Sequence, residues 1–337
     1  MVPKKVSFGL WYSMRNPKAW ETDIVDLYQE HLNQIVIAEK LGYDMVWLTE
    51  HHFCEDAHAP SILPLAAAIS VKTKTIRIGT GVLLLPLHNA VRVAEDTATI
   101  DILSKGRFEL GVGIGYRPEE FKGLGVSLSD RPRLMNEGLA IISELLRGKS
   151  VTFNGTHYNL DNLTIKPLPV QRPRPPVWVG GFVEESAKRA ARFGDGYIGF
   201  GDLRDLRKRF LDEWHLTNRQ EEPKIAGGHF WLVATRSPKK TFQEISPHVL
   251  YQMKIYNKWL KEAGQKLFPE ITNVHDLKKL GILQCVSPTE ACDIVNDYIH
   301  ENKVTHYYNW TVPPGYPVKK MNEHLELFAT EVIPFFR

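Results

Sequence analysis

The feature that most constrains this chain is a regular alternation of short apolar strands and amphipathic helices. Alternation of this kind is typical of parallel sheets whose strands are joined by right-handed crossovers. Eight strand-then-helix units predict a closed (β/α)8 barrel of the α/β class, a TIM barrel. The strands are predicted at residues 6–11, 45–49, 76–85, 108–112, 177–179, 196–198, 229–234 and 304–310.

Two segments depart from the alternation. Residues 151–175 are rich in Pro, Asn and Thr and have no helical period, so we expect a hairpin-like insertion. Residues 235–287 show the least clear pattern and are expected to be less regular. Because no Gly/Ser linker or shift in composition divides the chain, residues 1–337 are predicted to form a single domain.

The alternative fold is an open, doubly wound sheet of the dinucleotide-binding type. Such a sheet would carry GxGxxG after its first strand, but residues 10–13 read Leu-Trp-Tyr-Ser. The later segment 111–115 reads Gly-Val-Gly-Ile-Gly and lacks the third glycine of that pattern. The closed barrel therefore remains the predicted fold.

Composition excludes several classes of partner. The formal charge is only +3, and no Lys/Arg-rich block with interleaved aromatic residues is present. These features do not support binding to nucleic acid or to membrane lipid. Cys54, Cys285 and Cys292 have neither CxxC nor zinc spacing, and an odd number fits a reducing compartment. The first fourteen residues lack the apolar core of a signal peptide, and no later run approaches the length of a membrane span. We therefore expect a cytoplasmic protein.

Glu50, His51 and His52 directly follow the predicted strand at 45–49. Barrels build their sites from residues at the carboxyl ends of the strands. A carboxylate beside a histidine could fix the tautomer of the imidazole and tune a group that titrates near neutral pH. The competing interpretation is that Glu50 and His51 only cap the next segment.

A metal ion is the chemical rival for the paired histidines. Adjacent side chains at a strand end point to opposite sides, so His51 and His52 rarely bind one ion together. A metal-dependent hydrolase would be expected to show further ligands at other strand ends, for which His58 and His88 are the candidates. We predict no metal site.

Glycines end two further strands. In the segment 79–82, Gly-Thr-Gly-Val, a flat ligand could lie against the exposed backbone, and a bulge in a barrel strand is the alternative. Gly113 ends the next strand and is followed by Tyr116, whose hydroxyl could hydrogen-bond a ligand. A tight turn around barrel packing explains the same residues equally well.

A third glycine turn precedes a predicted helix. Gly180, Gly181 and the backbone amides at the helix start could bind an anion, with Ser186 as an added donor. Glu184 and Glu185 oppose this interpretation, because like charges near a phosphate are unfavourable unless the side chains point away.

In this order, these segments resemble the bacterial luciferase-like family of flavin-dependent monooxygenases and its deazaflavin-dependent relatives. The resemblance extends over most of the chain. It is carried by residues 47–53 (WLTEHHF), 76–82 (IRIGTGV), 85–92 (LPLHNAVR), 94–96, 101–108, 113–116, 120–121, 177–181, 190–196 and 328–334.

The resemblance implies a (β/α)8 barrel that holds reduced flavin mononucleotide (FMN) at its carboxyl-end mouth. Glu50 and His51 match the family's active-site pair, in which His51 would be the base or proton donor and Glu50 would orient it. Thr80, Gly81 and Val82 match the strand whose backbone, often through a non-proline cis peptide, supports the flavin ring.

The resemblance also assigns the phosphate side of the cofactor. Gly180, Gly181 and Ser186 match the family's phosphate-side turn and helix start. Gly113 and Ile114 stand where the luciferase subunit has a reactive cysteine and a phosphate-binding arginine. The missing arginine leaves both the mode of phosphate binding and the choice between FMN and a deazaflavin coenzyme open. The insertion at 151–175 occupies the place of a mobile segment near the mouth.

We therefore predict a two-component monooxygenase. A separate flavin reductase would supply reduced FMN, and this chain would use molecular oxygen to oxygenate a small organic substrate, apolar or carbonyl-bearing. Two alternatives stay open: a deazaflavin-dependent hydride-transfer enzyme on the same barrel, and a non-catalytic flavin-binding partner subunit. The family and the apolar faces of the barrel helices favour a homodimer.

Overall fold

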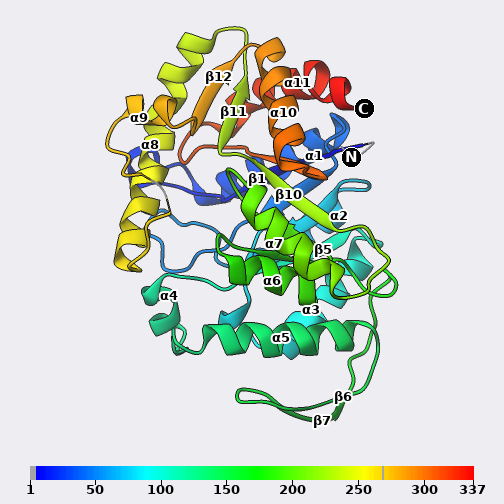
Figure 1. The fold of residues 1–337 in the computed structure, drawn as a ribbon. Helices are drawn as coiled ribbons and strands as arrows, with labels where there is room; N and C mark the ends of the chain where they lie inside the picture. The colour runs from blue at the N-terminus through cyan, green and yellow to red at the C-terminus, as the bar shows by residue number, and fades with distance from the viewer. Residues whose placement is uncertain (1–4, 268) are drawn as a thin grey trace.

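Eight short parallel strands form the closed barrel that the sequence predicts (Figure 1). The computed structural model describes residues 5–267 and 269–337. Neighbouring strands pair in parallel around the ring, which closes where β3 pairs with β5. The barrel strands are β1 (Ser7–Tyr12), β2 (Met45–Leu48), β3 (Arg77–Thr80), β5 (Phe108–Gly113), β8 (Val177–Gly180), β9 (Gly196–Ile198), β10 (Lys224–His229) and β13 (His306–Trp310).

Helices connect the strands and cover the outside of the barrel (Figure 1). Several begin at a polar residue that caps them: Asp23 accepts the N–H of Val25, and Asn89 accepts the N–H of Val91. No helix in the described part of the chain combines the length and the apolar character needed to cross a membrane. The helices are α1 (Ile24–Lys40), α2 (Ile62–Lys72), α3 (Ala90–Leu103), α4 (Pro118–Gly123), α5 (Arg131–Leu146), α6 (Glu184–Phe193), α7 (Arg204–His215), α8 (Pro238–Glu262), α9 (Val274–Lys279), α10 (Pro288–Asn302) and α11 (Val318–Glu331).

Two tryptophans fill the inside of the barrel. Trp47 and Trp178 meet edge to face, with ring centroids 5.5 Å apart. Glycines on neighbouring strands make the room: a Cβ on Gly79 would lie 2.5 Å from Trp47, and one on Gly196 would lie 2.3 Å from Trp178. The interior is therefore a packed core of large side chains set against small ones, and any ligand must bind at an end of the barrel.

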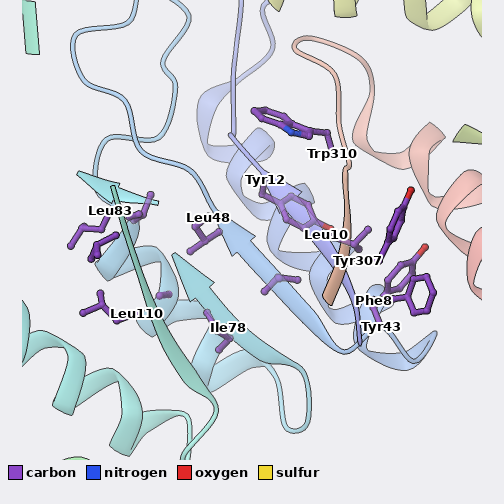
Figure 2. Close-up of a cluster of buried hydrophobic side chains, with 14 of the residues drawn as sticks. Phe8, Leu10, Tyr12, Tyr43, Leu48, Ile78, Leu83, Leu110, Tyr307 and Trp310 are labelled. Carbon is purple, nitrogen blue, oxygen red and sulfur yellow. The ribbon is translucent and has the colours of Figure 1, made fainter. Parts of the chain in front are cut away.

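A second core lies between the strands and the helices. Figure 2 shows Leu10, Leu48, Ile78 and Leu110 on β1, β2, β3 and β5, and all four side chains are buried. The strands are thus covered on both faces, which explains why they appear in the sequence as continuous apolar runs.

The predicted insertion is a β-hairpin. β6 (Val151–Asn154) and β7 (Asn159–Leu163) pair in antiparallel fashion, as expected for residues 151–175. The carboxylate of Glu137 on α5 accepts three backbone N–H groups of the turn at 2.9–3.2 Å. The hydroxyl of Tyr158 in the turn also accepts the N–H of Ala90 at the start of α3. The hairpin is therefore joined to two barrel helices.

The prediction of the seventh barrel strand at 229–234 was wrong. The barrel strand is β10, and the apolar run that follows it, β11 (Trp231–Ala234), pairs outside the barrel with β12 (Leu283–Val286). The barrel strand has a weak sequence signal because close packing demands small residues: a Cβ on Gly228 would lie 1.7 Å from the carbonyl oxygen of Tyr308.

The expectation of irregular structure at 235–287 was also wrong. This segment contains α8, a helix of 25 residues, followed by α9 and β12. A proline normally ends a helical pattern, and Pro247 lies inside α8. That proline interrupts the pattern by which a helix is predicted.

Candidate active site at the barrel mouth

The polar strand ends meet at one mouth of the barrel because the strands are parallel. The N–H of Leu84, just after β3, donates to the carboxylate of Glu50, just after β2, at 2.8 Å. Glu120 in α4, the helix after β5, lies 2.8 Å from His51. Figure 1 shows α4 and α8 on this same side of the molecule, at the left of the view.

Glu50 is buried and holds two imidazoles. Its Oε1 accepts hydrogen bonds from Nε2 of His52 at 2.6 Å and from Nε2 of His88 at 2.7 Å. Burial raises the pKa of Glu50, but the hydrogen bonds from the two histidines outweigh it and bring the pKa below its usual value. Glu50 is therefore a charged carboxylate at neutral pH.

His51 is held by a different carboxylate from the one predicted. Its Nδ1 donates to Oε1 of Glu120 at 2.8 Å, whereas Glu50 points to His52 and His88. The expectation that Glu50 orients His51 was thus wrong, because consecutive side chains at a strand end point to opposite sides. Glu120 lay inside a segment that carried the family resemblance, but no spacing rule connects residues that are 69 positions apart.

Glu120 is itself fixed by two further donors. The backbone N–H of His52 donates to its Oε1 at 2.9 Å, and Nη1 of Arg117 donates to the same oxygen at 3.1 Å. Burial raises the pKa of Glu120, but the hydrogen bond from His51 and the nearby positive charges bring it below its usual value. A charged carboxylate at Nδ1 leaves Nε2 of His51 as the nitrogen that can exchange a proton.

An aromatic wall surrounds the His51 ring. Its centroid lies 4.8 Å from Trp259, 6.1 Å from Tyr256 and 5.8 Å from Tyr116. The guanidinium carbon of Arg117 lies over the Trp259 ring, 4.0 Å from its centroid. Burial raises the pKa of Tyr116 well above its usual value, so its hydroxyl stays protonated. Sequence reasoning missed the two residues from α8 because that helix was not predicted.

Between Gly79 and Leu83 the chain has one residue more than the facing part of β5, which is the bulge that the sequence offered as the alternative interpretation. The peptide bond between Gly81 and Val82 is cis, as the family resemblance implied. The hydroxyl of Thr80 donates to the carbonyl of Gly111 at 2.6 Å and accepts its N–H at 2.9 Å. The chain then continues as β4 (Leu83–Leu84), which pairs with β5.

The side chain of Val82 accounts for the need for glycine at two of the strand ends. A Cβ on Gly113 would lie 2.4 Å from one methyl group of Val82, and a Cβ on Gly180 would lie 2.7 Å from the other. Gly113 and Gly180 therefore leave room for the side chain of Val82. The result is a half-buried Val82 set between β5 and β8 at the mouth.

The turn after β8 is closed by its own hydrogen bonds. The hydroxyl of Ser186 donates to the carbonyl of Val183 at 2.5 Å, and a Cβ on Gly181 would lie 2.5 Å from the Ser186 side chain. Ser186 is buried, and the N–H of Gly181 donates to Ile198. Ser186 thus has a structural role in the turn, and its contact with a cofactor phosphate stays a prediction.

One group of residues has the spacing of metal ligands. In the described part of the chain, the ligand atoms of Glu50, His52 and His88 all lie within 4.8 Å of one another. Hydrogen bonds between the carboxylate and both imidazoles already account for this arrangement. The absence of a metal remains a prediction.

A parallel barrel with charged side chains gathered at one mouth defines a (β/α)8-barrel protein with an enzyme-like site. Residues 6–262 match the family described as luciferase-like monooxygenase, and the chain belongs to that family.

Similar proteins include members with different cofactors. The chain is 29% identical to the oxygenase component of a flavin-dependent trigonelline monooxygenase from Acinetobacter baylyi, over 98% of this chain and 95% of that one. It is 34% identical to an F420-dependent glucose-6-phosphate dehydrogenase from Microbacterium testaceum, over 48% and 50%. It is 31% identical to the uncharacterized protein y4vJ of Sinorhizobium fredii, over 57% of each chain. The chain thus spans only about half the length of the last two relatives.

Solved structures share the fold at low sequence identity. Monooxygenase RslO1 from Streptomyces bottropensis superposes with a TM-score of 0.84 at 19% identity, over 98% of this chain and 100% of that one. The oxygenating constituent of 3,6-diketocamphane monooxygenase from Pseudomonas putida, in complex with FMN, gives 0.81 at 16% identity, over 99% of both chains. At these identities the likeness concerns the fold alone.

Proposed function

We propose that this chain is the oxygenase component of a two-component, flavin-dependent monooxygenase. A separate reductase supplies reduced FMN, and a small organic substrate is oxygenated with molecular oxygen. The observation that carries the proposal is the alignment with an oxygenase component over 98% of the chain, while the alignment with the F420-dependent relative covers 48%.

The residues at the mouth fit a planar cofactor. The cis bulge at Thr80–Val82 presents backbone and the Val82 side chain, an apolar surface on which a ring system can lie. Bound reduced FMN would supply the reaction with oxygen, and the turn at Gly180–Gly181 is the proposed place of its phosphate. The buried network on the other side of the mouth limits the access of water.

His51 is the proposed proton-handling residue. Its Nδ1 is bound to Glu120, so Nε2 can accept a proton from the substrate or return one. Glu120 is a positioning residue, and Arg117 fixes Glu120. Tyr116 provides a neutral hydroxyl beside the His51 ring.

Cofactor titration tests the proposal. The full-length protein is titrated under anaerobic conditions with reduced FMN, with riboflavin and with reduced deazaflavin coenzyme, and binding is followed by calorimetry. Oxygen is then admitted, and the oxidation of the flavin is followed by absorbance. We expect reduced FMN to bind more tightly than the other two, and its oxidation to be slower when bound than in free solution.

The two alternatives give different results. Binding of deazaflavin in preference to FMN, with anaerobic turnover, would identify a hydride-transfer enzyme on the same barrel. Tight FMN binding with no product formed by the purified protein and any partner reductase, or an activity that His51→Ala leaves intact, would favour a non-catalytic partner subunit. Sedimentation of the purified protein tests the proposed homodimer.

A further inference from the structure

A buried guanidinium lies beside the mouth. Arg15, in the loop after β1, has a fully buried side chain, and its three nitrogens make no hydrogen bond to any described residue. Its charge is paired with that of Asp56, whose Oδ2 lies 3.1 Å from Nη1. Because a guanidinium carries five N–H donors, most of the binding capacity of Arg15 is unused.

Arg15 lies against the same two aromatic rings as His51. Its Cζ lies 5.1 Å from the ring centroid of Tyr256 and 5.2 Å from that of Trp259. The His51 ring lies 6.1 Å and 4.8 Å from the same two rings. The guanidinium and the imidazole are therefore neighbours under α8.

The backbone around Arg15 and Asp56 is held in an unusual conformation. Met14, just before Arg15, and Ala57, just after Asp56, have φ values of 54° and 52°, a region that residues other than glycine seldom occupy. The N–H of Asn16 donates to the carbonyl of Asp56 at 2.7 Å, so the two loops are joined. Neighbouring structure thus keeps the cation in its buried position.

The other charged groups nearby are already engaged. Arg117 donates to Glu120, to Glu119 and to the carbonyl of His52. Burial, and then the charge of Arg15, hold the pKa of His58 well below its usual value, so His58 adds no charge. A buried donor without a partner destabilises a protein, so several free donors on one cation indicate that a ligand completes the site.

We propose that Arg15 binds a carboxylate of the substrate, and that Tyr256 and Trp259 pack against its apolar, ring-bearing part. This inference rests on the proposed function and names its substrate class: an organic anion in place of the apolar or carbonyl-bearing compound predicted from the sequence. The planar fork of a guanidinium matches a carboxylate with two parallel hydrogen bonds. Because Arg15 lies near His51, the ring-bearing part of such a substrate would lie next to the proton-handling group.

A pair of isosteric probes tests the anion preference. Benzoate and benzamide have the same shape and differ in charge, and each is titrated into the full-length protein by calorimetry and by tryptophan fluorescence. We expect benzoate to bind at least tenfold more tightly than benzamide. Arg15→Gln should abolish this ratio, and Arg15→Lys should keep part of it. Arg92→Gln, at a side chain on α3 that is 67% exposed, is the matched control and should change nothing.

Asp56→Asn should change the affinity for benzoate in the opposite direction to Arg15→Gln. Removal of the carboxylate leaves Arg15 as an uncompensated buried cation, so benzoate should bind more tightly than to the wild type. This variant also decides the question if Arg15→Gln does not fold. Equal affinity of the wild type for benzoate and benzamide, an unchanged ratio in Arg15→Gln, or weaker benzoate binding in Asp56→Asn would overturn the proposal.

The phosphate of the cofactor is the other anion that Arg15 could bind. The ratio of FMN to riboflavin affinity is therefore measured in the wild type and in Arg15→Gln. The ratio should not change if Arg15 binds the substrate, and its loss would assign Arg15 to the phosphate and overturn the substrate assignment. If no variant and no wild-type protein bound flavin at all, the proposed function would fail, whereas the benzoate result would still stand.

Discussion

The two sides of the barrel mouth differ in construction. On the side formed by the loops after β2 and β5, Glu50, His51 and Glu120 are buried; Glu120 accepts a hydrogen bond from His51, and Glu50 accepts one from His52. On the side formed by the turn after β8, Phe182 and Val183 are 47% and 57% exposed, and the polar atoms of the turn bind one another.

This difference indicates a division of tasks. A buried network of charges has a fixed geometry and shifted pKa values, which proton transfer requires. A turn with exposed apolar side chains is held mainly by its own hydrogen bonds and can rearrange to admit or release a cofactor. The buried side should therefore control the rate of the reaction, and the open side should control the exchange of the flavin.

The largest effect is expected for Glu120→Gln. The amide keeps the shape but removes the charge that holds Nδ1 of His51, so kcat should fall by about 10²- to 10³-fold, in the range for a disturbed proton-transfer group. FMN binding should stay within twofold. Glu119→Gln, at a neighbouring side chain that is 63% exposed, is the control. A kcat close to that of the wild type would show that this side does not handle protons.

The two sides meet at Val82, and Gly113→Ala and Gly180→Ala test that junction. Each new methyl group would lie less than 3 Å from a Val82 methyl group, so each variant should be destabilised by up to about 3 kcal/mol in urea unfolding. Flavin affinity should fall as Val82 moves. The double variants with Val82→Ala should recover most of the lost stability, and a failure to recover would mean that the clash is not the cause.

The same contrast explains what the sequence could predict. The closed barrel follows from strand runs that are apolar on both faces, and the helices at 131–146 and 184–193 lie where the periodicity places them. Polar residues at strand ends located the mouth correctly, because parallel strands bring their carboxyl ends together. Local patterns were sufficient for these features.

The partners of the site residues could not be predicted in the same way. His51 and Glu120 are 69 positions apart, and Tyr256 and Trp259 belong to a helix that a central proline obscured. Glycine at positions 113 and 180 signals a close approach, but the sequence does not say whether a ligand or Val82 makes it. Such pairings depend on the closure of the barrel, and this is a long-range property.

A smaller effect, dependent on pH, is expected for His88→Ala on the buried side. Burial lowers the pKa of His88, but its hydrogen bond to Glu50 outweighs burial and raises it, so this stabilisation is complete below about pH 6.5 and is lost as pH rises through the raised value. The lowered pKa of Glu50 gives stabilisation that is complete above about pH 4.5 and is lost in acid. The hydrogen bond between His88 and Glu50 should therefore stabilise the protein most between about pH 4.5 and about pH 6.5.

Urea unfolding from pH 4 to pH 9 measures this contribution. His88→Ala removes a hydrogen bond to a charged group, so it should lower the free energy of unfolding by about 2 kcal/mol near pH 6 and by less at pH 9. The exposed His300→Ala serves as the control. A loss of stability that does not depend on pH would show that His88 only packs against its neighbours.

The smallest effect is expected for Ser186→Ala on the open side. Its hydroxyl closes the turn before α6, so its removal should lower the free energy of unfolding by about 1 kcal/mol. Ser287→Ala removes a similar cap at the start of α10 and should have the same effect on stability. If Ser186→Ala weakened the binding of FMN but not of riboflavin, its hydroxyl would contact the phosphate, and the open side would be a fixed binding site rather than a turn that rearranges.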